Sequence, residues 1–434
     1  MRFSKLKIWK QLAIVGFLLF FLALPISKGL VSIAVGVLFG TAVFRLFQRP
    51  RFAFPNYWWL PIILFVLLVI SVTYSDSYRT AWKALYRQNM LLLLPIAFWG
   101  NADICRQYFR QGIQVFVSTC AFASAVTLLF FVLPGSTSIQ ITETFSFLQE
   151  YIVHEKIYAF GSYSPFIDRL QFSYILSTAL VLHLYLYLKS KRKVWLFFSF
   201  LLPLAALLIL GARGAQIAFL ISSSVTIIVL YFRFAHTFMS THLGKWWSTV
   251  GSILLIKIII VLILYLVYRS IPAIHIRYDQ LIWEIGTLED GTYKNYAYEH
   301  FTSLRRLVSW ESTWQVIQNQ PISGVGIGDH NEVLSEQYKQ GQFDIPVNSH
   351  QQFLYYWAVA GLGAMLTFLL AYFHFFRLAI KSKSWWKQVT LLTFILFYGI
   401  VFCFDSPLIY QTGGLAFWSF YLLLVPFLEK EESL

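Results

Sequence analysis

His350 is the residue best placed for acid–base chemistry, because of the short sequence around it. Pro346 interrupts the preceding segment. Ser349 and Gln352 have the three-residue spacing of a helix capping box, so we expect a helix to start at His350. A helix start favours a neutral imidazole and attracts phosphate through its unpaired N–H groups. The stretch therefore predicts a base beside a phosphate, and the alternative is an ordinary capped transmembrane helix.

Two arginines could bind the anion beside such a base. Arg213 lies in Gly-Ala-Arg-Gly between two apolar runs, and its planar guanidinium suits a diphosphate. Arg306 lies on a predicted amphipathic helix over residues 302–318 and shares a face with Trp310, four residues later. Each arginine has a structural alternative: Arg213 can snorkel to the membrane interface, and Arg306 can be a solvated surface residue.

A glycine run, Gly-Val-Gly-Ile-Gly at residues 324–328, looks like a phosphate loop. No strand precedes it, and Asp329 occupies the place of the last glycine in G-x-G-x-x-G, so we expect a flexible turn instead. His330 follows directly and could reach the site. His330, His350 and Asp329 lack the spacing of known metal ligands, so we predict neither a metal nor another cofactor.

The composition places these residues in a membrane protein. The chain has 434 residues, of which 58% are apolar and 12% charged, with a mean hydropathy of +0.63. Soluble domains carry about 25% charged residues. The net charge of +14 sits in short loops at the ends of apolar runs and forms no basic domain, which argues against a nucleic-acid partner.

The apolar runs predict an all-α polytopic fold. About twelve runs are long enough to cross ~30 Å of hydrocarbon. They fall near residues 11–27, 29–47, 57–73, 82–99, 112–133, 171–188, 194–211, 214–233, 247–270, 350–376, 388–404 and 410–428. Lys257 lies in the middle of one of them, where a charge is costly and usually paired or snorkelling.

Basic residues in alternate loops predict the orientation of the chain. Arg45, the basic run at 189–193 and the lysines of 381–387 fall on one side, so we expect these loops and both termini in the cytoplasm. Residues 134–170 and 271–349 then form the long external segments. We expect an N-terminal transmembrane bundle over 1–270, one large periplasmic loop with amphipathic helices over 271–349, and C-terminal transmembrane helices over 350–434.

At this point a resemblance can be stated. His350-Gln351, nine further residues and Gly361-Leu362-Gly363 resemble the histidine signature of the O-antigen ligase and polymerase superfamily. The likeness covers about residues 201–370 and includes Arg213, the Arg306-x-x-x-Trp310 pair and residues 321–328. One position departs: Ala364 stands where the ligase signature usually has a second glycine.

The resemblance implies a reaction. Members move a glycan from undecaprenyl diphosphate to a hydroxyl at the periplasmic face of the bacterial inner membrane, without metal or nucleotide. We expect His350 to accept the acceptor's proton and Arg213 and Arg306 to stabilise the diphosphate. We expect further substrate contacts from His330, Arg305, Trp310 and Gln351.

Several acceptors and one different class of protein stay open. A sugar of lipid A-core ranks first as acceptor (ligase), ahead of a growing lipid-linked chain (polymerase) and a Ser or Thr of a secreted protein (O-oligosaccharyltransferase). The different class is a transporter of lipid-linked sugars. A transporter does not need the external amphipathic helix, and it more often places ionisable residues at the bilayer midplane. A purely structural membrane scaffold is the least favoured alternative.

Overall fold

The computed structural model describes residues 2–48, 54–132, 164–189, 193–229, 265, 272–292, 302–341, 343, 348–382 and 384–430. Within these residues the chain is all-helical and contains no strand, as the apolar runs predict. Lys257, nearly all of the expected span at 247–270 and most of the segment at 134–170 lie outside the described residues.

The helices follow one another along the chain with short connections. Their bounds are α1 Arg2–Ala23, α2 Lys28–Gln48, η1 Asn56–Trp58, α3 Trp59–Val72, α4 Tyr78–Arg87, α5 Met90–Gly100, α6 Ala102–Val132, α9 Arg169–Lys189, α10 Lys193–Ile209, α12 Pro272–Glu289, α13 Thr302–Asn319, α14 His330–Gln340, α15 Gln352–Lys381, α16 Trp385–Phe404, η4 Pro407–Ile409 and α17 Gln411–Lys430. A further apolar helix spans Arg213–Val229.

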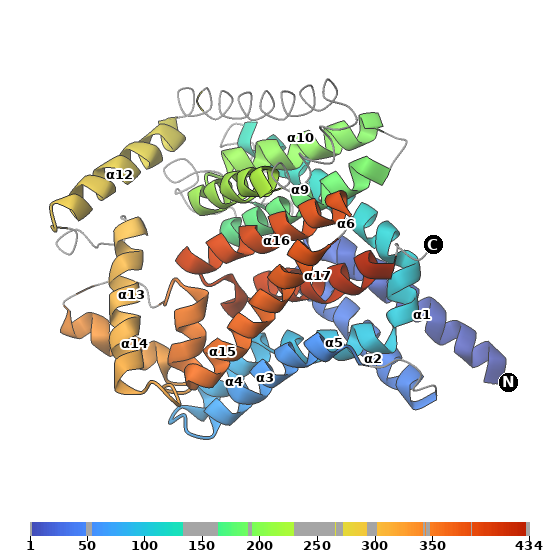
Figure 1. The fold of residues 1–434 in the computed structure, drawn as a ribbon, viewed down its shortest axis with the longest axis horizontal. Helices are drawn as coiled ribbons and strands as arrows, with labels where there is room; N and C mark the ends of the chain where they lie inside the picture. Colours follow the sequence, from blue (N-terminus) through green and yellow to red (C-terminus); the bar gives the residue numbers. More distant parts are fainter. Residues whose placement is uncertain are drawn as a thin grey trace.

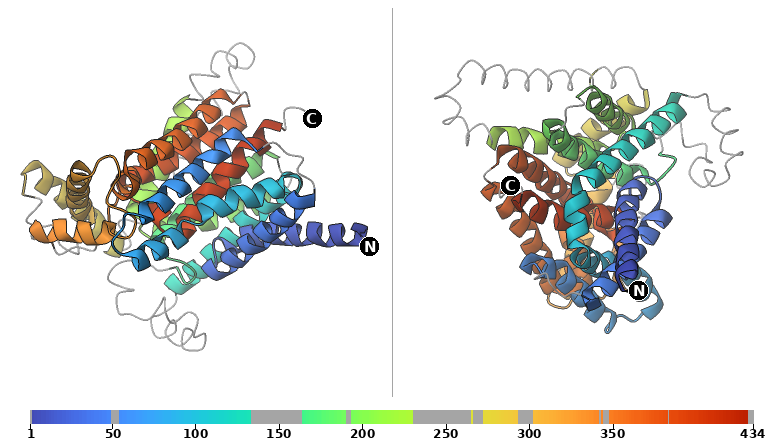
Figure 2. Two further views of the ribbon diagram at one scale, coloured as in Figure 1. Left: turned by 90° about the horizontal axis from the view of Figure 1, so that it is seen from below. Right: turned by 90° about the vertical axis from the view of Figure 1, so that its right-hand side faces the viewer.

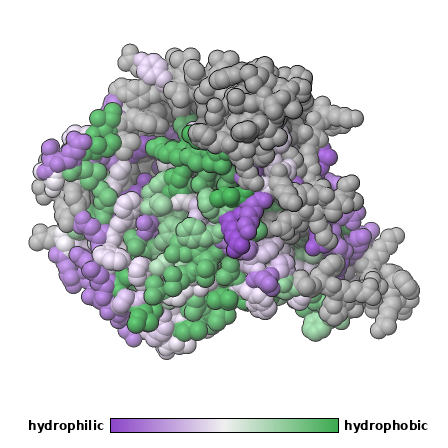
Figure 3. All heavy atoms as spheres, viewed as in Figure 1, coloured by the Kyte–Doolittle hydropathy of each residue, from purple (hydrophilic) through white to green (hydrophobic). Residues whose placement is uncertain are grey.

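Four described helices are long and apolar enough to cross a membrane: Lys28–Phe47, Ala102–Leu129, Gln352–Lys381 and Lys387–Phe404. Shorter apolar helices, such as Asn56–Val72 and Arg213–Val229, accompany them. Hydrophobic residues cover the middle of the face in Figure 3, and hydrophilic residues gather toward the end where α12–α14 lie. The chain is therefore a membrane protein. The number of twelve spans and the division at residues 270 and 350 stay predictions.

The apolar helices form a bundle, and α12–α14 gather at one of its ends (Figures 1 and 2). α1 begins at the opposite end. α13 lies across the end of the bundle and packs against α15 and α14. The apolar periodicity over residues 302–318 thus correctly predicts this helix, and α13 delivers its side chains to the start of α15.

An aromatic core fixes α15, α16 and α17 against one another. Phe368 on α15 lies 5.2 Å from Phe402 on α16, and Phe402 lies 5.1 Å from Phe417 on α17, measured between ring centroids. All three rings are buried. Because aromatic pairs add specific geometry to apolar burial, this core gives the loops at the helix ends a rigid support.

The predicted span at 82–99 is wrong as a single helix, because the chain breaks between α4 and α5. The amide nitrogen Nε2 of Gln88 donates a 2.8 Å hydrogen bond to the carbonyl of Leu408. Gln88 is buried, so its side chain needs a partner, and the nearest one is the loop after α16. The break therefore ties α4 to the segment that follows α16.

α15 is interrupted in its middle, where the pattern of small residues predicts close helix packing instead. Ala360 (φ −132°, ψ 21°) and Gly361 (φ 75°, ψ −173°) leave the helical conformation. The carbonyls of Ala358 and Val359 accept hydrogen bonds from the N–H groups of Val325 (2.8 Å) and Gly326 (3.0 Å). The peptide groups released by the break are thus paired with the glycine run at residues 324–328.

Glycine is required at this contact for a steric reason. A Cβ on Gly361 would lie 1.8 Å from the carbonyl oxygen of Ile322, and a Cβ on Gly324 would lie 2.6 Å from the carbonyl oxygen of Ala358. Both glycines also have positive φ, which side chains disfavour. The expectation of a flexible turn at 324–328 is therefore wrong: the run is a docked segment.

The other side of this segment is bound by the corner between α3 and α4. The carboxylate of Asp329 accepts hydrogen bonds from the backbone N–H groups of Asp76 (2.7 Å) and Ser77 (2.9 Å). The N–H of Gly328 donates to the hydroxyl of Ser75 at 3.1 Å. The segment at 321–329, which we call the glycine segment, is consequently clamped between α15 and this corner.

Candidate functional site

His350 lies before α15 rather than in its first turn. The helix begins at Gln352, and His350 has a φ of 47°, a left-handed conformation that is uncommon for a residue other than glycine. The predicted capping box is also wrong. The Ser349 hydroxyl lies 2.8 Å from Nε2 of His330, and the Gln352 carbonyl oxygen accepts from the N–H of Leu408 at 2.9 Å. Both side chains thus have tertiary partners.

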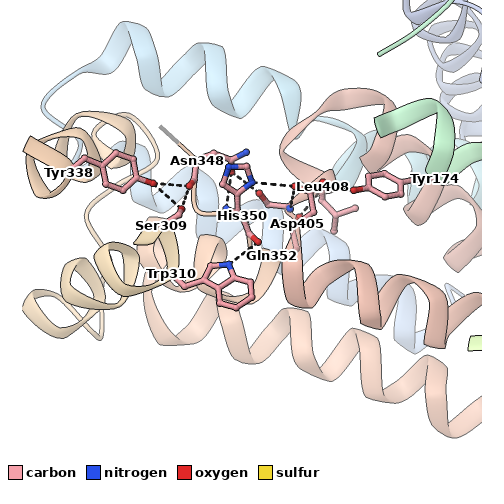
Figure 4. Close-up of polar contacts among 10 residues, drawn as sticks. Tyr174, Ser309, Trp310, Tyr338, Asn348, His350, Gln352, Asp405 and Leu408 are labelled. Carbon is pink, nitrogen blue, oxygen red and sulfur yellow. Dashed lines mark hydrogen bonds and ion pairs between the residues drawn. The ribbon is translucent and has the colours of Figure 1, made fainter. Parts of the chain in front are cut away.

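Two hydrogen bonds hold the backbone of His350 in this conformation (Figure 4). Its N–H donates to Oδ1 of Asn348 at 3.0 Å, and its carbonyl accepts from the indole N–H of Trp310 at 3.1 Å. The indole belongs to α13, so the helix across the end of the bundle fixes the residue before α15. Left-handed strain of this kind persists only where surrounding contacts determine it, and it is concentrated at functional sites.

Asn348 connects three elements around the histidine. Its backbone carbonyl accepts from the hydroxyls of Ser309 on α13 and Tyr338 on α14, the latter at 3.0 Å. Its side-chain oxygen also accepts from the Ser406 hydroxyl, after α16, at 2.9 Å. Figure 4 shows these groups on the two sides of His350. α13, α14 and the end of α16 therefore meet at this short segment.

The imidazole is buried but its two nitrogens are not occupied. His350 is 8% exposed, and neither Nδ1 nor Nε2 has a hydrogen-bond partner among the described residues. Nδ1 lies 3.8 Å from Oδ1 of Asp405, which is longer than a hydrogen bond. Buried polar atoms are rarely left unpaired, so an unpaired imidazole here indicates a site for a partner that binds from outside the chain.

Asp405 is the functional candidate that the sequence reasoning missed. It follows α16 directly and is 4% exposed. Its carboxylate accepts from the Ser406 N–H at 2.9 Å and from the hydroxyl of Tyr174 on α9. The available signal was the polar Asp-Ser-Pro stretch between two apolar runs at the end of the chain.

The charges around His350 and Asp405 set their protonation states. Burial lowers the pKa of His350 below its usual 6.5, Asp405 raises it, and Arg306 and Arg305 lower it further, with a net lowering. Burial alone would raise the pKa of Asp405, but His350, Arg306 and the Tyr174 hydroxyl together hold it below its usual range. At neutral pH the imidazole is therefore uncharged and the carboxylate ionised.

Arg306 reaches this pair from α13. Its guanidinium carbon lies 5.8 Å from the centre of the Phe404 ring, the last residue of α16. Its Nε is buried without a hydrogen-bond partner among the described residues. Arg305, its neighbour, acts electrostatically on His350. Two cations thus lie near the imidazole, and the face shared by Arg306 and Trp310 points toward the histidine segment.

Arg213 arrives at the same ring from another direction. The turn before it uses Gly211 at a φ of 62°, and the side chain of Gln216 donates to the carbonyls of Leu207 (2.9 Å) and Leu208 (3.0 Å). Next to Arg213, a Cβ on Gly214 would lie 2.5 Å from Phe404. The turn that carries Arg213 therefore packs against the ring over which Arg306 lies.

The other predicted residues take supporting positions. His330 begins α14, is 3% exposed, and contacts Ser349 and, at 3.1 Å, Asn331. Burial lowers its pKa to about 4. Gln351 is the N-cap residue of α15 and makes no side-chain capping bond. These contacts favour a positioning role for His330, and direct substrate contacts of His330, Arg305, Gln351 and Trp310 stay predictions.

The comparisons with known proteins agree with this region of the chain. Residues 198–369 match the family model described as O-antigen ligase. A comparison with curated proteins gave no match. The matched residues run from α10 through the turn of Arg213, α13 and the glycine segment into α15, and so include His350. The chain belongs to the O-antigen ligase-like superfamily, which is associated with ligase- or polymerase-type glycan transfer.

Proposed function

We propose that this protein transfers a glycan from an undecaprenyl-diphosphate carrier to an acceptor hydroxyl at the periplasmic face of the bacterial inner membrane. The observation that carries the proposal is the buried, unpaired imidazole of His350 beside an ionised Asp405 and the cations of α13. A neutral imidazole can accept a proton, and the cations can stabilise the charge that a leaving diphosphate develops.

His350 is the general base in this proposal. Nδ1 faces Asp405 at 3.8 Å, which leaves Nε2 for the acceptor hydroxyl. The acceptor oxygen attacks the anomeric carbon and its proton passes to Nε2. The bond between that carbon and the phosphate oxygen breaks, and the diphosphate departs with the electron pair. Asp405 stabilises the imidazolium that forms, so it is a positioning residue.

Arg306 and Arg213 hold the diphosphate. Both are associated with Phe404, Arg306 through its guanidinium and Arg213 through the turn that carries it. A guanidinium offers two parallel N–H groups to phosphate oxygens and keeps its charge at all physiological pH values. Arg305 adds positive potential near the imidazole.

The orientation supports the periplasmic side. Basic loops on the opposite side of the membrane place both termini in the cytoplasm by the positive-inside rule. α12–α14 and His350 then lie outside, where lipid-linked glycans are delivered. We propose lipid A-core as the acceptor, in agreement with the O-antigen ligase description of the matched family.

The test uses the full chain in vesicles with purified lipid-linked glycan and lipid A-core. We expect His350→Ala to lower the transfer rate by about 10²-fold or more. His374→Ala is the matched control, because His374 lies on the same helix but stacks on Tyr57 at 5.3 Å. Equal activity of both variants would refute the base assignment.

The acceptor is tested in the same assay with three separate substrates. Transfer to lipid A-core supports the ligase assignment. Elongation of lipid-linked glycan without transfer to lipid A-core would replace it with a polymerase, and glycan on serine or threonine of a secreted protein would replace it with a protein O-oligosaccharyltransferase. Carrier movement across the bilayer without any new glycosidic bond would indicate a transporter.

A further inference from the structure

α4 carries a repeated pair of side chains that the reaction does not use. Its sequence places an aromatic residue and a cation together three times, four residues apart, as Tyr78-Arg79, Trp82-Lys83 and Tyr86-Arg87. Residues four apart lie on the same side of a helix. The three aromatic residues therefore form one ridge and the three cations a second ridge beside it, and the helix contains no acidic residue.

Both ridges face away from the protein. Tyr78, Trp82 and Tyr86 are 57%, 60% and 66% exposed, and the three cations are exposed as well. The opposite side of α4 packs Ala81 and Leu85 into the core. Among the described residues, none of the three cations forms a salt bridge. The chain thus presents large aromatic side chains and uncompensated positive charge on one fixed surface.

The surface is held rigidly at both of its ends. Asp329 accepts hydrogen bonds from Asp76 and Ser77 immediately before α4, and Gln88 immediately after it binds the carbonyl of Leu408. Figure 1 shows α4 beside α3. α3 ends at Val72, and the chain passes through only a short corner before α4 begins at Tyr78. α4 therefore starts where an apolar helix reaches the membrane surface.

We propose that this surface of α4 binds anionic phospholipid headgroups of the leaflet next to His350. Tyrosine and tryptophan are favoured at the headgroup level, where the ring is partly apolar and the polar atom stays hydrated. Cations beside them bind lipid phosphate, and each contributes about a fivefold gain in affinity. The occupant is thus argued from charge complementarity and from continuity with α3. The proposal does not depend on glycan transfer.

A fluorophore on α4 tests the proposal in the full-length protein. We place bimane at Thr80→Cys in a Cys403→Ser background, since Cys105 and Cys120 are buried and Thr80 is exposed. The protein is reconstituted in nanodiscs of phosphatidylcholine that contain a small fraction of nitroxide-headgroup lipid. We expect nitroxide-phosphatidylglycerol to quench the bimane more strongly than nitroxide-phosphatidylcholine at the same mole fraction.

Charge variants identify the groups responsible. R79Q/K83Q/R87Q should abolish the difference between the two lipids, an expected loss of about 100-fold in relative affinity. K10Q/R377Q/K381Q removes the same charge from exposed positions elsewhere and should keep the difference. Equal quenching by both lipids, no quenching by either, or relief of quenching by a lipid-free glycan would each overturn the proposal.

Discussion

Gly361→Ala is the substitution that tests most directly how α15 is built. Gly361 has a φ of 75°, and a Cβ there would lie 1.8 Å from the Ile322 carbonyl oxygen. The obstacle is backbone, not a side chain that can rotate away. It is also held in place, because the neighbouring Pro321 carbonyl accepts from the N–H of Leu362 (3.1 Å) and the indole of Trp357 (2.8 Å).

The expected loss of stability follows from these contacts. A side chain at positive φ costs about 1 kcal/mol or more. Moving the glycine segment away also breaks the hydrogen bonds from Val325, Gly326 and Leu362, each with a net contribution of about 1 kcal/mol. We therefore expect Gly361→Ala to lower the free energy of unfolding by about 4 kcal/mol.

Gly363→Ala is the matched control, two residues later on the same helix. A Cβ at Gly363 would meet only a side-chain atom of Leu67, at 3.9 Å, and alanine favours helix over glycine by up to ~1 kcal/mol. Thermal unfolding of both variants in the same detergent measures the difference. Equal midpoints for the two alanine variants would refute the docking of the glycine segment as the reason for the break.

Three other substitutions have expected outcomes. Asp405→Asn removes the carboxylate that raises the pKa of His350, so the acid limb of the transfer rate against pH should move to lower pH while the maximal rate falls; a purely structural role for Asp405 predicts no shift of that limb. Arg306→Ala should slow single-turnover transfer by about 10²-fold and Arg306→Lys by less, and equal rates in both would contradict a guanidinium fork on the diphosphate. Asp329→Asn leaves one acceptor oxygen for two N–H groups and should lower the free energy of unfolding by about 1–3 kcal/mol, measured by chemical denaturation.

The apolar helices could be predicted from the sequence because their signal is local. Hydropathy and helical periodicity indicate α9, α10, α13 and α16 within a few residues of their observed bounds. Arg306 and Trp310 were placed on one face by spacing alone, and in the structure Trp310 contacts the His350 carbonyl. Such patterns depend on neighbours in the sequence and not on distant partners.

The parts that failed depend on distant partners. Ser349 and Gln352 have capping spacing, but His330 and Leu408 compete for their side chains. Asp405 lies far from His350 in the sequence, and no spacing rule connects them. The small residues around Gly361 indicated that something approaches closely, while their types could not reveal that it is a loop backbone and not another helix.

The break in α15 has a consequence for how the chain enters the membrane. Backbone groups at membrane depth must be paired, and here the partner of the interrupted helix is the segment made just before it. α15 therefore cannot reach its final shape on leaving the insertion machinery unless residues 321–328 reach it from the aqueous side. Protection of that segment from protease should appear only in nascent chains that extend beyond residue 362, so insertion of α15 and docking of the glycine segment form one step of biogenesis.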